Sequence, residues 1–167
     1  MLAALEALVK LESPTEDLQA CQDVIKLASD LATKVLGTPA EIRDVNGRPV
    51  FWWGANNPEI VVLAHLDTVW PKGSFTPLWK VEGTKATGPG IFDMKAGFIQ
   101  ALYAMKGITG SVALVATTDE ETGSATSKEF IKQISAQSKA VLVVEASLDG
   151  MVKTARKGTA MYQIKIH

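Results

Sequence analysis

The sequence predicts an α/β fold with a mainly parallel, mixed sheet and helices on both faces. Three short, continuous apolar runs, at residues 60–64, 112–117 and 140–144, have the length of strands. Such uninterrupted runs are typical of strands buried on both faces of a sheet. Residues 94–106 and 126–134 lie between them and show helical spacing of apolar residues. Alternation of strands and helices favours parallel strands covered by helices.

The N-terminal part is expected to form two helices. Apolar residues at helical spacing predict the first over residues 2–11. The second is expected to begin at Ser13, because a serine suits the capping position, Pro14 suits the first helical position and Glu16 suits a capping box. It is expected to end before Gly37, since glycine commonly follows the last turn of a helix.

Turn signals and loops separate the remaining elements. Asn46-Gly47 is the strongest short signal for a β-hairpin. Residues 65–92 are rich in proline and glycine and are expected to be mostly irregular. A loop of that length in a compact domain is usually functional. Alternating apolar residues from Ala160 onward predict a further strand that is still under way at His167.

The composition is that of an ordinary globular protein. The chain has 167 residues, 47% hydrophobic and 21% charged, with a net charge of −1. No basic stripe is present, so we expect no nucleic-acid partner. The single cysteine excludes an internal disulfide and a cysteine-rich zinc site. No apolar run is long enough to span a membrane and the start lacks a secretion signal, so a cytoplasmic location is expected.

Ionisable residues follow each predicted buried strand. His65 and Asp67 come after the first, residues 119–121 (Asp-Glu-Glu) after the second and Glu145 after the third, while Asp93 precedes a helix. Ligands of open α/β sheets bind at the carboxyl ends of the strands. So many acids at one edge are costly unless a positive charge neutralises them. The pattern therefore predicts a metal centre.

The residue types indicate which metal and which roles. One imidazole with several carboxylates suits zinc, manganese or cobalt. Asp67 is spaced to accept the second N–H of His65, as carboxylates beside metal-bound histidines commonly do. Glu120 and Glu121 diverge in an extended segment, so one is expected to bind metal. The other is expected to act as general base toward a metal-activated water.

Together these motifs resemble the M20 metallopeptidases, a family that includes glutamate carboxypeptidase, acetylornithine deacetylase, succinyl-diaminopimelate desuccinylase and aminoacylase. The resemblance covers nearly the whole chain. The segments that carry it are His65-Leu-Asp67-Thr, Gly88-Pro-Gly90-Ile-Phe-Asp93-Met-Lys95, Thr118-Asp-Glu120-Glu121-Thr-Gly123-Ser124, Glu145 and Arg156-Lys-Gly158.

The resemblance implies a site with two divalent ions, zinc first and Co²⁺ or Mn²⁺ as alternatives. His65 would bind one ion, Asp93 would bridge both, Glu121 would bind the second and Glu145 would complete the shell of the first. It also implies a cis peptide after Asp93.

The implied reaction is hydrolysis of an amide bond in a peptide or an N-acyl amino acid, as in a carboxypeptidase or deacylase. The candidate catalytic residues are Glu120, as the general base, and Asp67, as the carboxylate that orients the histidine. Arg156 is a candidate for contact with a substrate carboxylate, whereas Lys72 and Lys95 are expected to be solvated.

The resemblance also predicts the domain organisation. Residues 1–152 would be the N-terminal part of a catalytic domain, and residues 153–167 would begin an inserted lid or dimerisation domain. Family members are considerably longer and supply a further histidine ligand from their later part. The full-length protein is expected to form a homodimer through the lid, and activity of the 167 residues alone is expected to be impaired.

Two other functions are compatible with the residues. The chain could be a non-catalytic short form that binds a single metal or a partner chain. It could also be a dinucleotide-binding domain, but the stretch from Gly88 to Asp93 lacks the third glycine of that fingerprint.

Overall fold

The computed structural model describes residues 1–147, 149–155, 157–158 and 162–166. Its helices are α1 (Leu2–Lys10), α2 (Leu18–Leu36), α3 (Ala96–Ala104) and α4 (Lys128–Gln137), with two short helical turns, η1 (Ile91–Lys95) and η2 (Glu120–Thr122). Its strands are β1 (Glu41–Val45), β2 (Arg48–Gly54), β3 (Ile60–His65), β4 (Lys80–Glu82), β5 (Lys85–Thr87), β6 (Val112–Thr117) and β7 (Ala140–Val143).

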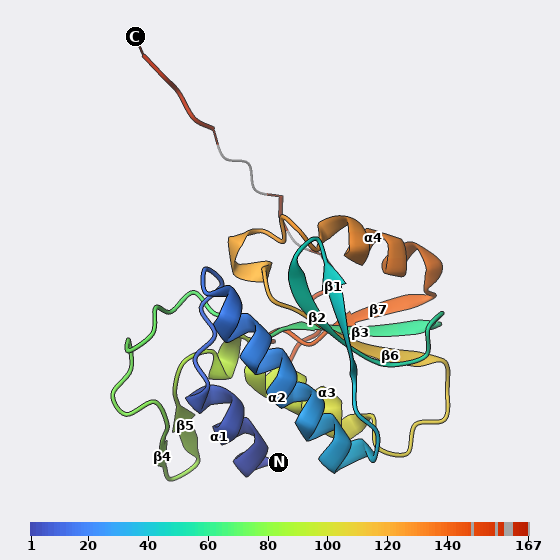
Figure 1. The fold of residues 1–167 in the computed structure, drawn as a ribbon, viewed down its shortest axis with the longest axis horizontal. Coiled ribbons are helices and arrows are strands. Elements are labelled where there is room, and N and C mark those ends of the chain that lie inside the picture. Colours follow the sequence, from blue (N-terminus) through green and yellow to red (C-terminus); the bar gives the residue numbers. More distant parts are fainter. Residues whose placement is uncertain (148, 156, 159–161, 167) are drawn as a thin grey trace.

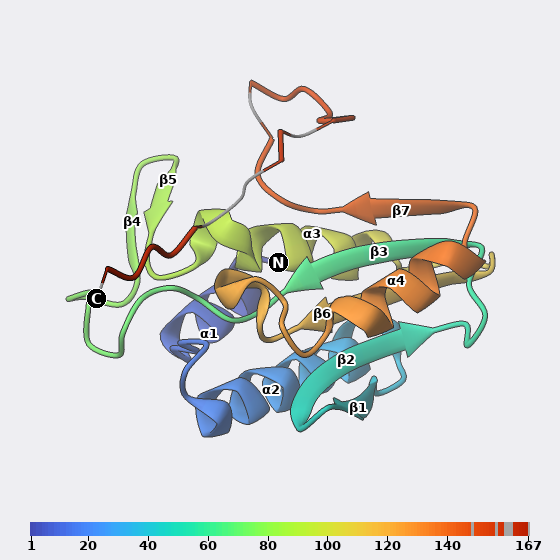
Figure 2. The same ribbon diagram turned by 90° about the horizontal axis from the view of Figure 1, so that it is seen from above.

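A mixed five-stranded sheet organises the molecule, with strand order β1-β2-β6-β3-β7. Strands β6, β3 and β7 are parallel, whereas β1, β2 and β6 pair antiparallel. Helices α1, α2 and α3 cover one face and α4 covers the other (Figures 1 and 2). The predicted α/β fold with helices on both faces is therefore confirmed.

Alternation along the strands creates a core on each face. Leu114 and Ala116 of β6 pack toward α1–α3, in one cluster with Phe51 and Phe98. The residues between them face α4 instead, in a cluster that includes Val115 and Ile134. Because side chains alternate across a strand, a central strand that is apolar at every position serves both cores.

The expectation that residues 140–144 form a strand is confirmed, but the expectation that this strand is buried is wrong. Strand β7 lies at the edge of the sheet, and Leu142 and Val143 are more than half exposed. Within residues 65–92, the short β4–β5 hairpin was also not expected. The described residues 162–166 are not part of a strand, and Ala160 and His167 of the expected terminal strand lie outside the described residues.

The start of α2 differs from the expectation. Asp17, not Ser13, caps the helix by accepting a hydrogen bond from the Ala20 N–H at 2.9 Å. The Ser13 hydroxyl instead donates to the Leu66 carbonyl at 2.6 Å. Residues 13–15, the connector, thus run beside the segment that follows β3. A serine before a proline resembles a helix cap in sequence, but here its partner is 53 residues away.

Lys95 is buried, so the expectation that it is solvated is wrong. Its side chain is fully covered, and its Nζ donates to the carbonyls of Leu8 at 3.0 Å and Leu11 at 3.1 Å. These carbonyls end α1, where the helix leaves acceptors unsatisfied. Lys95 therefore ties η1 to α1. Lys72, in contrast, forms an exposed ion pair with Asp17.

Burial lowers the pKa of Lys95 from 10.5 to about 7. Between these values the unfolded chain binds a proton that the folded chain has released, so stability rises with pH. We expect the free energy of unfolding to increase by about 2 kcal/mol from about pH 7.5 to 9.5, relative to a Lys95→Met variant. Urea denaturation of both proteins at each pH measures this difference. An equal change in the free energy of unfolding of the two proteins between these pH values would contradict the prediction.

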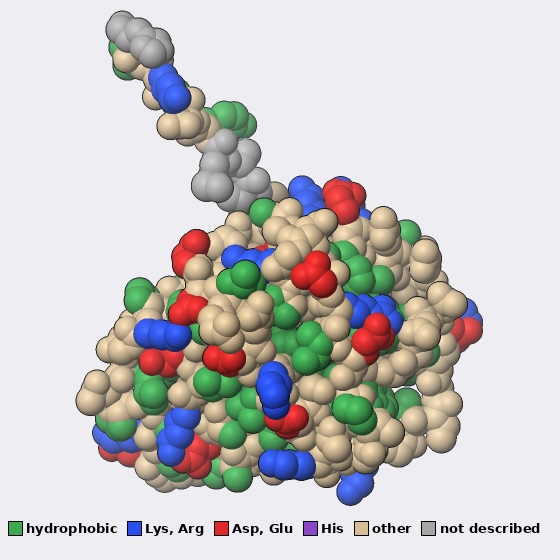
Figure 3. Space-filling model, viewed as in Figure 1, with side chains coloured by type: hydrophobic (Ala, Val, Ile, Leu, Met, Phe, Trp, Pro, Cys, Tyr) green, Lys and Arg blue, Asp and Glu red, His purple; other side chains and the backbone are tan. Residues whose placement is uncertain are grey.

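Among the described residues, no helix combines the length and apolar character needed to cross a bilayer. On the face shown in Figure 3, basic and acidic side chains are interspersed rather than gathered by sign.

Candidate metal centre

Three of the predicted ligands meet beyond the carboxyl ends of the parallel strands. The Nε2 atom of His65 lies 3.0 Å from Asp93 Oδ1 and 3.3 Å from Glu145 Oε1. One ligand atom from each of the three residues lies within 4.8 Å of the others. The sheet edge thus brings together residues that are up to 80 positions apart in the sequence.

The sheet and α3 position these side chains. His65 is the last residue of β3, and Glu145 follows the neighbouring strand β7. Asp93 lies in η1 just before α3, and the Asp93–Met94 peptide is cis, as the resemblance implied. Gly97 of α3 lies directly under the chain before Glu145, because a Cβ there would stand 1.9 Å from the Val144 carbonyl oxygen.

Asp67 lies behind the imidazole and is fully buried. The Nδ1 atom of His65 is 3.1 Å from the Asp67 carbonyl oxygen and 3.4 Å from Asp67 Oδ1. Both of these neighbours from the described part of the chain are acceptors, so Nδ1 carries the proton. The lone pair of neutral His65 therefore lies on Nε2, directed at Asp93 and Glu145.

The acids around His65 favour a positive charge in the site. Burial lowers the pKa of His65, but hydrogen bonds to Asp67 and Glu145 outweigh it and raise the pKa to about 11. In turn, the hydrogen bond to His65 outweighs burial and holds the pKa of Glu145 below its usual value. A proton on Nε2 supplies this positive charge, and a divalent cation bound by the same atoms would supply it too. The donor set therefore fits a metal ion.

Glu120 and Glu121 come from η2, next to these ligands. Glu120 Oε2 lies 3.9 Å from His65 Nε2, and its side chain is 47% exposed. Burial raises its pKa and His65 opposes this rise, but the nearby acids Glu145, Asp67 and Asp93 add to it, and the net shift is upward. Burial also raises the pKa of Glu121, whose carboxylate is not among the three ligand groups that converge.

Asp119, which directly precedes Glu120 and Glu121 in the sequence, stabilises the local loop. Its Oδ2 accepts hydrogen bonds from the backbone N–H groups of Thr126 and Ser127 and from the Thr126 hydroxyl. Burial raises the pKa of Asp119, but these bonds outweigh it and the net shift is downward. Asp119 thus closes the loop that follows η2.

A sequence model of peptidase family M20/M25/M40 matches residues 61–161 of the chain. That match covers more than half of the sequence and includes every residue of the site described above. The chain belongs to peptidase family M20/M25/M40.

Similar proteins agree with this M20 assignment. Carboxypeptidase G2 of Pseudomonas sp. (strain RS-16) is 32% identical over 123 residues, which are 68% of this chain and 30% of the relative. Among solved structures, the M20 family metallo-carboxypeptidase Sso-CP2 from Sulfolobus solfataricus matches with a TM-score of 0.72 and 21% identity, covering 88% of this chain and 37% of that one.

Human carnosine dipeptidase 1 matches with a TM-score of 0.67 and 16% identity, over 85% of this chain and 37% of that one. These structures support the same fold. This M20 chain spans about a third of the length of the relatives it matches.

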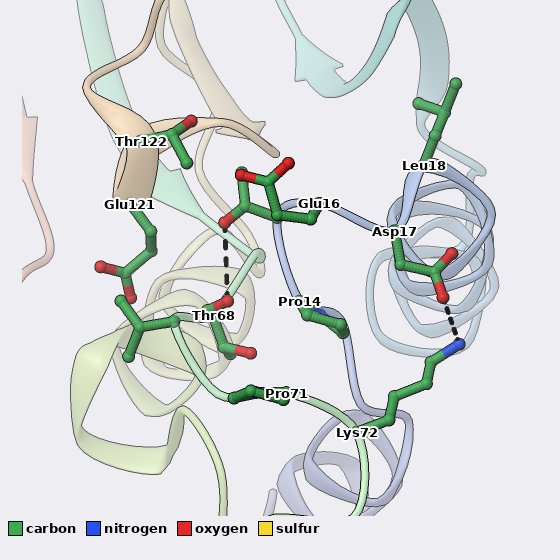
Figure 4. A pocket seen from close by; sticks show the side chains of 11 residues that line it. Pro14, Glu16, Asp17, Leu18, Thr68, Pro71, Lys72, Glu121 and Thr122 are labelled. Atoms are coloured by element: carbon green, nitrogen blue, oxygen red, sulfur yellow. Dashed lines mark hydrogen bonds and ion pairs between the residues drawn. The ribbon is translucent and has the colours of Figure 1, made fainter.

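A pocket of about 710 Å³ opens beside the candidate metal centre of this M20 chain, and Glu121 is among the residues that line it. Figure 4 shows it between the start of α2 and the loop that carries Thr68 and Pro71, with Glu121 on one side and the Asp17–Lys72 ion pair on the other. Arg156 and His167 lie outside the described residues, so the contact predicted for Arg156 stays a prediction.

Sequence reasoning missed three residues that shape the site. Ser13 and Thr15 belong to a Ser-Pro-Thr stretch that resembles a helix start, and nothing local distinguishes the two uses. Gly97 lies at an ordinary helical position. A glycine in the first turn of a helix, where it costs stability, was the available signal of a close backbone contact.

Proposed function

We propose that the protein is a metal-dependent hydrolase that cleaves the amide bond of a peptide or an N-acyl amino acid. The observation that supports this most is the convergence of His65, Asp93 and Glu145 on one point, in a chain of the M20 family. The carboxypeptidase and dipeptidase names of its relatives favour amide substrates.

His65, Asp93 and Glu145 would hold one ion, and Glu121 with Asp93 would contribute to a second. Zinc suits this set best, with Co²⁺ and Mn²⁺ as alternatives. When bound, the ions would polarise the scissile carbonyl and make water a better nucleophile at neutral pH.

The remaining chemistry belongs to the side chains. The Asp67 carbonyl, with the carboxylate of the same residue beside it, keeps the Nδ1 proton of His65 in place, so Nε2 stays available as a ligand. Glu120 would take a proton from the attacking water at its carboxylate and deliver it to the leaving amine nitrogen. Its raised pKa suits this role, because a base whose pKa approaches the working pH can both accept and return the proton.

The test combines metal analysis with turnover. The purified full-length protein, dialysed against a chelator and then titrated with Zn²⁺, is assayed on N-acetyl and N-benzoyl amino acids and on dipeptides. We expect loss of hydrolysis without metal and recovery with Zn²⁺. Tight binding of a single ion with no turnover on any of these substrates would favour the non-catalytic alternative. Absence of metal binding would contradict the proposed function and leave only the form that binds a partner chain.

A further inference from the structure

The connector, residues 13–15, pairs with the segment that carries Asp67. The Thr68 N–H donates to the Ser13 carbonyl at 2.8 Å, and the Thr15 N–H donates to the Thr68 carbonyl at 3.2 Å. The Ser13 hydroxyl adds its bond to the Leu66 carbonyl. This pairing continues the hydrogen bonding of the sheet beyond the end of β3, and it places Thr15 beside Asp67.

The Thr15 hydroxyl donates to Asp67 Oδ2 at 2.7 Å, and both residues are buried. The Glu121 N–H donates to the same oxygen at 3.2 Å. Two donors on Oδ2 fix the rotation of the carboxylate, so the other oxygen, Oδ1, faces His65 Nδ1. Within the described residues Oδ1 itself has no hydrogen-bond partner, so its direction toward His65 Nδ1 depends on the bonds to Oδ2.

We propose that Thr15 is a positioning residue of the metal centre: its hydroxyl holds Asp67, and through Asp67 it holds the His65 ring in the orientation that presents Nε2. This inference rests on the proposed function for its metal. Without the hydroxyl, the carboxylate keeps a single donor and rotates more freely. Loss of such an outer partner typically lowers metal affinity about 10- to 100-fold.

The backbone of Thr15 is held independently of its side chain. Arg48 Nη1 donates to the Thr15 carbonyl at 2.7 Å and to the Thr118 carbonyl at 2.9 Å. Replacement of the hydroxyl by a methyl group therefore leaves the connector anchored. A Thr15→Val variant keeps the shape of the side chain and removes the hydrogen bonds of the hydroxyl, the short one to Asp67 Oδ2 and a long one, at 3.5 Å, to the Thr68 carbonyl.

The experiment compares three variants of the purified protein. Thr15→Val removes the hydroxyl and Thr15→Ser retains it. Thr118→Val is the matched control, because the Thr118 hydroxyl is also buried but donates to the Pro49 carbonyl at 3.1 Å, away from Asp67. Zn²⁺ affinity is measured by competition with a chromophoric chelator, and the geometry is followed by the visible absorption of the Co²⁺-loaded protein.

We expect Thr15→Val to bind Zn²⁺ about 10- to 100-fold more weakly and to alter the Co²⁺ spectrum. Thr15→Ser and Thr118→Val are expected to stay within about threefold of the wild type. Equal losses in Thr15→Val and Thr118→Val, or no loss in either, would overturn the inference.

A metal-free measurement separates this inference from the proposed function. The Nδ1 proton of His65, observed by NMR in the metal-free protein, is expected to shift upfield in Thr15→Val as its hydrogen bond weakens. That shift in a protein that binds no Zn²⁺ would leave the positioning role intact and refute the proposed function. An unchanged His65 signal in a protein that does bind Zn²⁺ would refute the positioning role alone.

Discussion

Glu120→Gln is expected to lower kcat by about two to four orders of magnitude while the metal content stays that of the wild type. Glutamine has the shape of glutamate but cannot accept a proton at its side chain. Glu120 lies beside His65 but outside the three ligand groups that converge, so its loss removes a base and not a ligand. Steady-state kinetics on an N-acyl amino acid, with zinc analysis of the same samples, measures both quantities.

The control for this variant is Glu129→Gln. Glu129 lies in the first turn of α4, where its carboxylate forms an exposed ion pair with Lys132 at 2.8 Å. The same chemical change there is expected to leave kcat within about twofold, because exposed ion pairs contribute little. A Glu120→Gln enzyme that retains more than about a tenth of wild-type kcat would assign the base to another residue.

Gly97→Ala is expected to disrupt the candidate metal centre, although Gly97 is not itself one of the converging ligand residues. An added Cβ would stand 1.9 Å from the Val144 carbonyl oxygen, and ordinary contact begins at 3.4 Å. The backbone that leads to Glu145 would have to retreat by about 1.5 Å. A displacement of that size typically costs about 100-fold in kcat/KM. Zn²⁺ affinity is expected to fall as well, since Glu145 leaves its position beside His65.

Gly110→Ala is the matched control. A Cβ at Gly110 would meet only Val112 Cγ2, at 3.8 Å, which is ordinary contact. Circular dichroism establishes that both variants fold, and metal titration with kinetics then compares them. If Gly97→Ala binds Zn²⁺ as tightly as Gly110→Ala, the close approach of α3 to the Val144–Glu145 segment does not control the site.

The elements that sequence reasoning predicted best are those with strong local signals. The apolar strands and the Asn46-Gly47 hairpin appear as expected. Helices α3 and α4 are present with ends displaced by two or three residues, because helix ends depend on local contacts as well as on periodicity. The exposure of β7 was not predicted, since an apolar run has the same pattern at the centre and at the edge of a sheet.

Part of the candidate site was predicted from the strands, and part came from the family resemblance. The positions of His65 and Glu145 directly after predicted strands indicated that both belong to the site, because parallel strands bring their carboxyl ends to one edge. The roles of Asp93 and Glu121 came from the resemblance, and the structure places only Asp93 in the converging group. The assignment of Glu121 to a second ion stays a prediction.

By itself, the sequence determined which apolar segments form strands and which ionisable residues follow them. It thereby determined that acids gather at the carboxyl edge of the sheet. Only the tertiary structure decided how Ser13, Thr15 and Lys95 are used. The reason is physical: their hydrogen-bond partners lie 52 to 87 residues away, and a hydroxyl or an ammonium offers the same donors to a local cap, to solvent or to a distant acceptor. Folding selects among these partners through burial, because a buried donor without an acceptor is costly.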